Sequence, residues 1–64
     1  MTIGQRIKTR RLARNLTQAE AAAMLGVGQS RWADLEADRK NLTIGILISV
    51  AAVLKCPARD FLDR

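Results

Sequence analysis

Four side chains with hydrogen-bonding groups lie close together near the middle of the chain, at Gln29, Ser30, Arg31 and Asp34. If this segment is a helix, consecutive residues are rotated by about 100°. With Trp32 facing inward, Ser30 and Asp34 point outward, and the other two lie on the flanks. A glutamine amide can form two hydrogen bonds with the edge of adenine, and an arginine guanidinium can do so with guanine. This face of the segment therefore predicts a surface that contacts nucleic-acid bases.

Asp34 fits such a surface in two different ways. A carboxylate facing DNA is repelled by phosphates, but it can accept a hydrogen bond from the N4 amino group of cytosine. Alternatively, it pairs with a nearby arginine and orients that side chain. For all four residues, an ordinary solvated polar face is the simpler interpretation.

The elements that must position this face lie in residues 17–36, which read TQAEAAAMLGVGQSRWADLE. A first helix is predicted after Thr17, which forms a capping-box pattern with Glu20, and it ends at Gly26. A second helix is predicted at about 28–37. The break between them is too short for antiparallel helices, so the two must cross steeply, as in a helix-turn-helix unit.

Three further helices are predicted around this pair, which makes the expected fold all-α with five helices and the helix-turn-helix at about 18–37. Thr2 and Gln5 form a capping pattern for the first helix, which is expected to end near Asn15. Thr43 is the expected N-cap of the fourth helix, and Pro57 suits the first turn of a short fifth. The buried face of the first helix is expected at Ile3 and Ile7, and that of the fourth at Ile44, Leu47, Ala51 and Leu54. The fifth contains the apolar residues Phe61 and Leu62.

The composition excludes several kinds of protein. The chain has 64 residues and a net charge of +5, so we expect one domain, residues 1–64, with an anionic partner, either nucleic acid or a membrane surface. With no His and one Cys, we expect no metal, no cofactor and no intrachain disulfide. Cys56 is expected to be a small buried residue. Residues 41–54, the longest uncharged run, are too short to span a bilayer, and no signal peptide is apparent, so a soluble cytoplasmic protein is expected.

The order of these elements resembles the lambda-repressor-like (Xre-type) DNA-binding domain, whose members include small restriction–modification controller proteins. The resemblance covers residues 3–62. It is carried by Leu16-Thr17-Gln18-Ala19-Glu20, Ala22, Leu25-Gly26-Val27, Leu35-Glu36, Asn41-Leu42-Thr43-Ile44 and Ala51 to Leu54. It implies base-reading roles for Gln29, Ser30 and Asp34, on a helix whose N-terminal tip enters the major groove.

The resemblance also implies a partly buried ion pair between Arg11 and Glu36, which both fall on core-facing sides of their helices. Three residues depart from the family pattern. Trp32 stands where Ile or Val is usual, and Ala21 stands where a larger Leu or Val is common, so we hypothesise a compensating exchange of volume between them. Gly28 stands where Ser or Thr is frequent, which removes a possible cap.

Phosphate contacts are predicted on both sides of the base-reading helix. A helix N-terminus attracts anions because its first amides point outward, which favours Thr17 and Gln18. On the other side, Arg39, Lys40 and Asn41 lie in the loop after the second helix of the pair. Ordinary solvation is the alternative for Arg39 and Lys40.

The fourth predicted helix has an unusual surface, because residues 42–54 read LTIGILISVAAVL and carry no charge. A helix that is apolar nearly all round is buried on more than one side, and a monomer this small cannot cover it. We therefore predict a two-fold interface with a second copy, as related regulators form through this part of the fold. A merely hydrophobic surface helix is the alternative. The predicted interface residues are Gly45, Ile46, Ile48, Ser49, Ala52, Ala58 and Phe61.

Together these patterns predict a sequence-specific DNA-binding transcriptional regulator that acts as a homodimer on a pseudo-palindromic operator. A two-fold dimer places two recognition helices about 34 Å apart on one face of a duplex. An antitoxin or another protein-binding module on the same fold is one alternative, and nonspecific DNA packaging is another. An enzyme is not expected, because the sequence has no His, no carboxylate pair in an apolar setting and no phosphate-binding loop.

Overall fold

Four α-helices and one short 3-10 helix make up the part of the chain that the computed structural model describes, residues 1–39 and 42–62. They are α1 (Ile3–Ala13), α2 (Gln18–Leu25), α3 (Gln29–Glu36), α4 (Ile44–Leu54) and η1 (Ala58–Phe61). The all-α fold is confirmed within these residues. The fifth predicted helix is only a turn, since its hydrogen bonds join residues three apart and it stops after four residues.

Threonine caps begin three of the four α-helices, as the sequence predicted. Thr2 and Thr17 each accept a hydrogen bond from the backbone amide three residues later, and the side chains of Gln5 and Glu20 accept from the threonine amides in return. Thr43 caps α4 with its hydroxyl in the same way. Each cap satisfies an amide that the helix itself leaves without an acceptor, so these starts depend on local sequence alone.

The ends of α1 and α2 are also set locally. Gly26 ends α2 in the left-handed conformation, with φ 86°, which glycine adopts without the steric cost of a Cβ atom. Asn15, just beyond the end of α1, is left-handed as well, with φ 58°. Both positions were predicted as helix ends, and both are confirmed.

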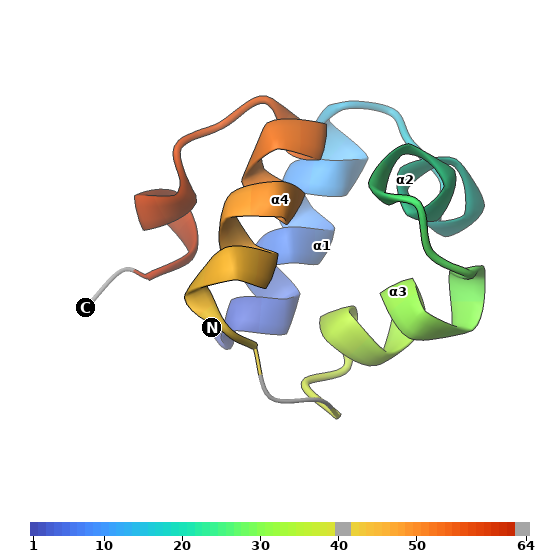
Figure 1. The fold of residues 1–64 in the computed structure, drawn as a ribbon. Helices are drawn as coiled ribbons and strands as arrows, with labels where there is room; N and C mark the ends of the chain where they lie inside the picture. Colours follow the sequence, from blue (N-terminus) through green and yellow to red (C-terminus); the bar gives the residue numbers. More distant parts are fainter. Residues whose placement is uncertain (40–41, 63–64) are drawn as a thin grey trace.

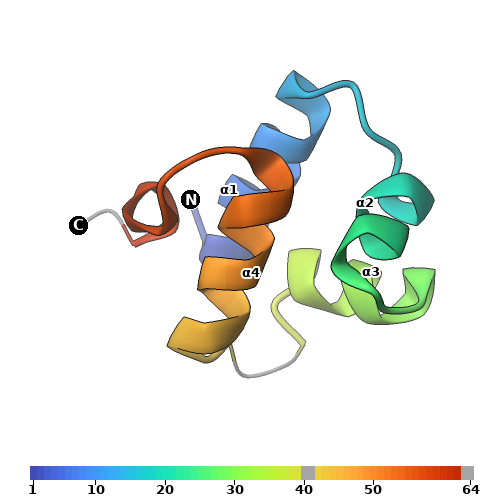
Figure 2. The same cartoon turned by 45° about the horizontal axis from the view of Figure 1, so that its top comes forward.

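The helices form two pairs around one core. In Figures 1 and 2, α1 and α4 lie side by side, and α2 and α3 form a crossed pair next to them. Both α2 and α1 pack on α3, while η1 packs on α4 and α1. The buried core contains Ile7, Ala21, Ala22, Trp32, Leu35, Leu47, Val50, Ala51, Leu54 and Phe61.

One prediction for the core-facing side of α4, that of Ile44, is wrong. Ile44 is 61 % exposed, while Leu47, Val50 and Leu54 are buried. Ile44 is the first residue of α4, and Cα–Cβ bonds in a helix tilt toward its N-terminus. The Ile44 side chain therefore projects past the end of the helix instead of over the core.

Gly4 lets α1 and α3 approach each other closely. A Cβ atom at this position would lie 2.8 Å from the carbonyl oxygen of Leu35 and closer still to that of Glu36. Both oxygens are backbone atoms near the end of α3, so neither can move aside alone. The amide of Gly4 also donates a hydrogen bond to Oδ1 of Asp38 at 2.9 Å. No local pattern in the sequence indicates this junction between the start of α1 and the end of α3.

Candidate nucleic-acid interface

The turn between α2 and α3 sets the direction of both helices. After the left-handed Gly26, the amide of Val27 donates a hydrogen bond to the carbonyl oxygen of Ala22 at 2.9 Å, which closes the end of α2. Gly28 is the N-cap of α3 and supplies no side-chain hydrogen bond. The helix then begins at Gln29, so its first turn emerges directly from this connection (Figure 2).

The first turn of α3 carries three of the predicted base-reading residues on its exposed side. Gln29, Ser30 and Arg31 are exposed, and Asp34 is half-buried one turn later. Trp32 is fully buried, as the predicted rotation of the helix requires. Amide, hydroxyl and guanidinium groups are therefore all accessible at the N-terminal end of α3.

Asp34 has an arginine partner. Its Oδ1 atom lies 3.5 Å from Nη1 of Arg39, and the backbone amide of Arg39 donates to the carbonyl oxygen of Asp34 at 3.0 Å. Of the two roles considered for Asp34, this geometry fits the one in which it orients an arginine. The Arg39 side chain is 73 % exposed, so its guanidinium stays open to a phosphate. Lys40 and Asn41, the other predicted phosphate contacts of this loop, lie outside the described residues.

Glu36 receives hydrogen bonds from three helices. Arg11 of α1 donates from Nε to Oε2 at 2.5 Å and from Nη2 to Oε1 at 3.3 Å. Trp32 of α3 donates from Nε1 to Oε2 at 2.6 Å, and Gln18 of α2 donates from Nε2 to Oε1 at 3.0 Å. Arg11 and Glu36 are 6 % and 8 % exposed, so they form a buried ion pair. The carboxylate thus ties together the elements that surround the helix-turn-helix unit.

These hydrogen bonds keep Glu36 ionised despite its burial. Burial by itself raises the pKa of Glu36, but hydrogen bonds from Arg11, Gln18 and Trp32, together with the charge of Arg11, hold the pKa below its ordinary value of 4.5. The bond from Trp32 was not predicted. The signal that could have indicated it is the spacing of four residues between the indole and the carboxylate, because such residues are neighbours on a helix.

The start of α2 keeps backbone donors for an anion while its side chains have partners inside the protein. The Thr17 hydroxyl accepts from the amide of Glu20 at 3.0 Å, and the Gln18 amide group is turned toward Glu36. The first hydrogen bond of the helix runs from the amide of Ala21 to the carbonyl oxygen of Thr17. The amides of Gln18 and Ala19 come before it, at the positive end of the helix dipole.

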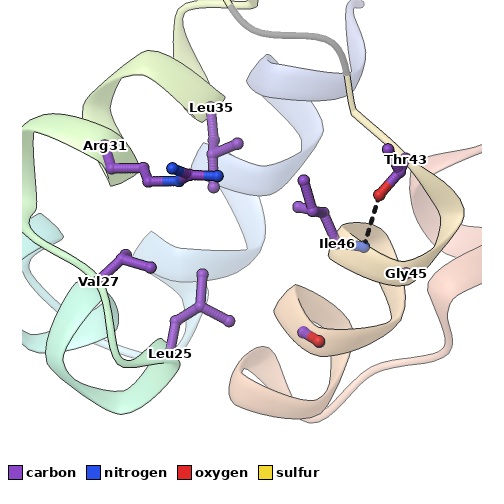
Figure 3. Close-up of a pocket in the computed structure, with 8 residues that line it drawn as sticks. Leu25, Val27, Arg31, Leu35, Thr43, Gly45 and Ile46 are labelled. Atoms are coloured by element: carbon purple, nitrogen blue, oxygen red, sulfur yellow. Dashed lines mark hydrogen bonds between the residues drawn. The ribbon is translucent and has the colours of Figure 1, made fainter.

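A pocket of about 360 Å³ separates α3 from α4 (Figure 3). Arg31 and Leu35 of α3 both line this pocket, and Figure 3 labels the two side chains. Arg31 has no hydrogen-bond or ion-pair partner within residues 1–39 and 42–62. This predicted base-reading residue therefore borders both the first turn of α3 and the pocket. The pocket is lined by Leu25, Val27, Arg31, Leu35, Thr43, Gly45, Ile46 and Ser49.

The far wall of the pocket belongs to a charge-free outer surface of α4, defined by Gly45, Ile48, Ser49 and Ala52, all exposed. We call it the α4 surface. Two other predicted interface residues, Ile46 and Ala58, are half-buried beside it. Phe61 needs correction, because it is 1 % exposed and packs in the core of its own chain. Its side chain is therefore not available to a second copy.

Residues 1–39 and 42–62 contain no group of three metal-ligating side chains and no helix long and apolar enough to cross a membrane. Cys56, expected to be buried, is half-buried. Burial raises the pKa of its thiol above the ordinary 9.0, so the unreactive protonated form predominates at neutral pH.

The crossed pair of α2 and α3, the ion pair that joins α1 to α3, and the exposed first turn of α3 define a lambda-repressor-like helix-turn-helix domain, the class of the DNA-binding repressors. A family model described as "Helix-turn-helix" matches residues 7–61, and the chain belongs to this family.

Similar proteins are regulators. The immunity repressor protein of Bacillus phage phi105 is 44 % identical over 54 residues, which are 84 % of this chain and 38 % of the repressor, so the chain spans less than half of that relative. The structure of SinR, a master regulator for biofilm formation, in complex with DNA has a TM-score of 0.88 and 35 % identity, over 97 % of this chain and 100 % of that one. The restriction–modification controller protein C.AhdI from Aeromonas hydrophila has a TM-score of 0.86 and 25 % identity, over 92 % and 89 %.

Proposed function

We propose that the chain binds double-stranded DNA sequence-specifically and regulates transcription, with α3 in the major groove. The observation that carries this proposal is the exposure of Gln29, Ser30 and Arg31 in the first turn of α3, while the buried Trp32 and Glu36 anchor the same helix. Gln29 and Arg31 supply the amide and guanidinium groups that recognise adenine and guanine edges. The net charge of +5 adds attraction to any duplex.

Phosphates would flank the groove contacts on both sides. At one side the free amides at the start of α2, with Thr17 and Gln18, form the positive end of a helix dipole. At the other side Arg39, oriented by Asp34, lies just beyond α3, and the adjoining Lys40 and Asn41 complete the proposed set. Such contacts set the position of α3 in the groove, while base contacts supply specificity.

We propose that the regulator acts as a homodimer on a pseudo-palindromic operator. One recognition helix contacts only a few base pairs, and a two-fold dimer doubles the site with half-sites one helical turn apart. The α4 surface supports this arrangement, because it is apolar and charge-free in a chain of net charge +5. Two copies repel each other least there.

The mechanism that follows is occupancy. A dimer bound at an operator blocks polymerase or recruits it, in the cytoplasm of a prokaryotic or phage-infected cell. The immunity repressor and the SinR–DNA complex among the similar proteins favour this function over a purely protein-binding antitoxin and over catalysis. Binding by charge alone is a separate hypothesis, and it predicts no preference for any sequence.

Selection of bound duplexes from a random library tests this function. We expect the parent chain to select a two-fold consensus, and we expect Gln29→Ala to lose its preference at one position in each half-site, by about 1–3 kcal/mol. Lys8→Ala is the matched control, because Lys8 is exposed on α1 and the consensus should survive its loss. Random recovered sequences from the parent would overturn sequence-specific binding. An unchanged consensus with Gln29→Ala would overturn only the base contact.

A further inference from the structure

The indole of Trp32 is fully buried, and its one polar atom is committed to Glu36. The Nε1–Oε2 distance of 2.6 Å is short for a bond from nitrogen, as expected for a donor to an ionised carboxylate. Both residues belong to α3, four positions apart, so the bond ties the side chain of Glu36 to its own helix. Filling a core position requires no N–H group, and an aliphatic side chain or phenylalanine would serve for packing alone.

The other bonds to Glu36 approach from different helices. Arg11 donates to both carboxylate oxygens from α1, and its Nη1 also donates to the carbonyl oxygen of Leu16 at 2.7 Å. Trp32 donates only to Oε2, which leaves Oε1 to be shared by Arg11 and Gln18. Without the indole, Oε2 would keep Arg11 as its one donor, and the carboxylate would lose the bond that ties it to its own helix. The indole and Arg11 therefore hold the carboxylate from two sides, which sets the direction in which Oε1 faces.

Oε1 in turn orients the side chain at the start of α2. Gln18 donates to it from Nε2 at 3.0 Å, and the Gln18 side chain is half-buried. One hydrogen of the Nε2 amide is used by this bond, which leaves its second hydrogen for another acceptor. This hydrogen and the backbone amides of Gln18 and Ala19 all belong to the start of α2, where N–H donors suit a phosphate.

We infer that Trp32 is a positioning residue for DNA binding: acting through Glu36, it holds the Gln18 side chain in the direction that contacts a DNA phosphate at the start of α2. This inference rests on the proposed function, because the phosphate is the one that DNA binding places there. Trp32 itself touches no DNA. It couples the proposed base-reading helix, α3, to a contact that α2 makes with the DNA phosphate backbone.

A double-mutant cycle on DNA affinity tests the coupling, with the selected consensus duplex at one salt concentration. Trp32→Phe keeps a buried aromatic ring and removes the N–H donor, and Gln18→Ala removes the amide that Glu36 holds. We expect Gln18→Ala to weaken binding about tenfold in the parent chain but about threefold or less in the Trp32→Phe background. The consensus should stay the same in both variants, because a phosphate contact carries no sequence information. If the double variant loses DNA affinity by the product of the two single losses, the residues are not coupled and the inference is overturned.

Two controls separate this coupling from a general loss of stability. Val50→Ala removes core volume in α4, outside the hydrogen-bond network, and we expect the full tenfold effect of Gln18→Ala to persist in that background. If Trp32→Phe does not fold, a synthetic chain with the benzothiophene analogue of tryptophan at position 32 keeps the ring shape and lacks only the donor. A full effect of Gln18→Ala in that chain would also contradict the inference.

Acid unfolding gives a second signature that packing alone does not produce. Removing one donor raises the folded pKa of Glu36, so we expect the loss of unfolding free energy in Trp32→Phe to shrink as the pH falls from 7 to 3, whereas the loss in Val50→Ala stays the same at each pH. A loss in Trp32→Phe that stays constant with pH would contradict the positioning role. If the parent chain selects no DNA sequence at all, the proposed function fails. If it selects a sequence but the double-mutant cycle is additive, only the role of Trp32 fails.

Discussion

At the scale of single residues, Glu36 is the ionisable group with the most partners in the described part of the chain, because Arg11, Gln18 and Trp32 all donate to it. A buried ion pair of this kind contributes little over a well-packed apolar pair, but removing one partner leaves a charge that water cannot reach. The same hydrogen bonds that satisfy the carboxylate also join α1, α2 and α3. Stability and the arrangement of the proposed DNA-binding surface therefore depend on one protonation state.

We predict that Glu36 makes the domain sensitive to acid. Its folded pKa is lower than the unfolded value of 4.5, so its stabilising contribution is fully present above pH 4.5 and is lost as the pH falls through the folded pKa. Glu36→Gln should lower the free energy of unfolding by about 3 kcal/mol at neutral pH, because Arg11 is left buried without a counter-charge. The difference from the parent should shrink in acid. Thermal unfolding from pH 7 to pH 3 measures it, and a constant difference would contradict the prediction.

At the scale of the elements, one close backbone approach and the packing of the core set the positions of the helices. Gly4 brings the start of α1 against the last carbonyl groups of α3, and Ala21 and Trp32 are both fully buried on α2 and α3. A small residue on one helix leaves room for a large neighbour on the other, which is how interiors keep their packing density. Substitutions at these positions should therefore shift whole helices.

Gly4→Ala should destabilise the domain by about 1–3 kcal/mol or more, because the added Cβ meets backbone atoms of α3 that cannot rotate away. Gly45→Ala is the matched control. The nearest atom to a Cβ there is Oγ1 of Thr43 at 3.8 Å, so alanine should stabilise α4 by about 0.5–1 kcal/mol. Chemical denaturation at a concentration where sedimentation shows monomer compares the two. Equal effects of the two substitutions would show that α1 and α3 separate freely.

Ala21→Leu tests the hypothesis of compensating volumes between α2 and α3. Ala21 is fully buried, and we expect the larger side chain to overpack the space that Trp32 fills and to cost about 1–3 kcal/mol. Ala23→Leu places the same side chain at an exposed position of α2 and should change stability little. An unchanged or higher melting temperature for Ala21→Leu would refute the hypothesis.

At the scale of the whole molecule, charge is distributed unevenly. The chain has a net charge of +5, yet α4 carries no charged residue and leaves Ile44 and Ile48 exposed. Exposed apolar side chains on a charge-free face favour association, and mutual repulsion of two basic chains is least there. The exposed first turn of α3 and the α4 surface meet at the pocket bordered by Arg31. The helix that we propose reads bases thus lies next to the proposed partner copy.

Ile48→Lys should weaken the proposed homodimer about a hundredfold, since it removes an apolar contact twice and places two charges in the interface. The folded monomer should be unaffected, because Ile48 is 56 % exposed. Leu12→Lys, at an exposed apolar residue of α1, is the matched control and should leave association unchanged. Sedimentation across a concentration series gives the result. A parent chain that stays monomeric at all concentrations would overturn the dimer.

Much of the fold could be predicted because helix ends depend on residues close in sequence. Thr2, Thr17 and Thr43 bond amides three residues later, and Gly26 adopts a conformation that few other residues tolerate. The all-α class and the crossed pair also follow from such signals. The exposed face of α3 followed from the helical rotation that places Trp32 inward, so the side chains of its first turn could be named in advance.

The tertiary structure decided which distant groups meet. The burial of Phe61 in its own core, the exposure of Ile44, the junction at Gly4 and the turn of Gln18 toward Glu36 all depend on where helices far apart in sequence lie. Spacing along a chain specifies the face of a helix but not its neighbours. Hydrogen bonds need partners within about 3 Å, and only the packed arrangement sets such distances. Sequence by itself therefore determined the helices and their exposed polar face, while the structure determined what anchors that face.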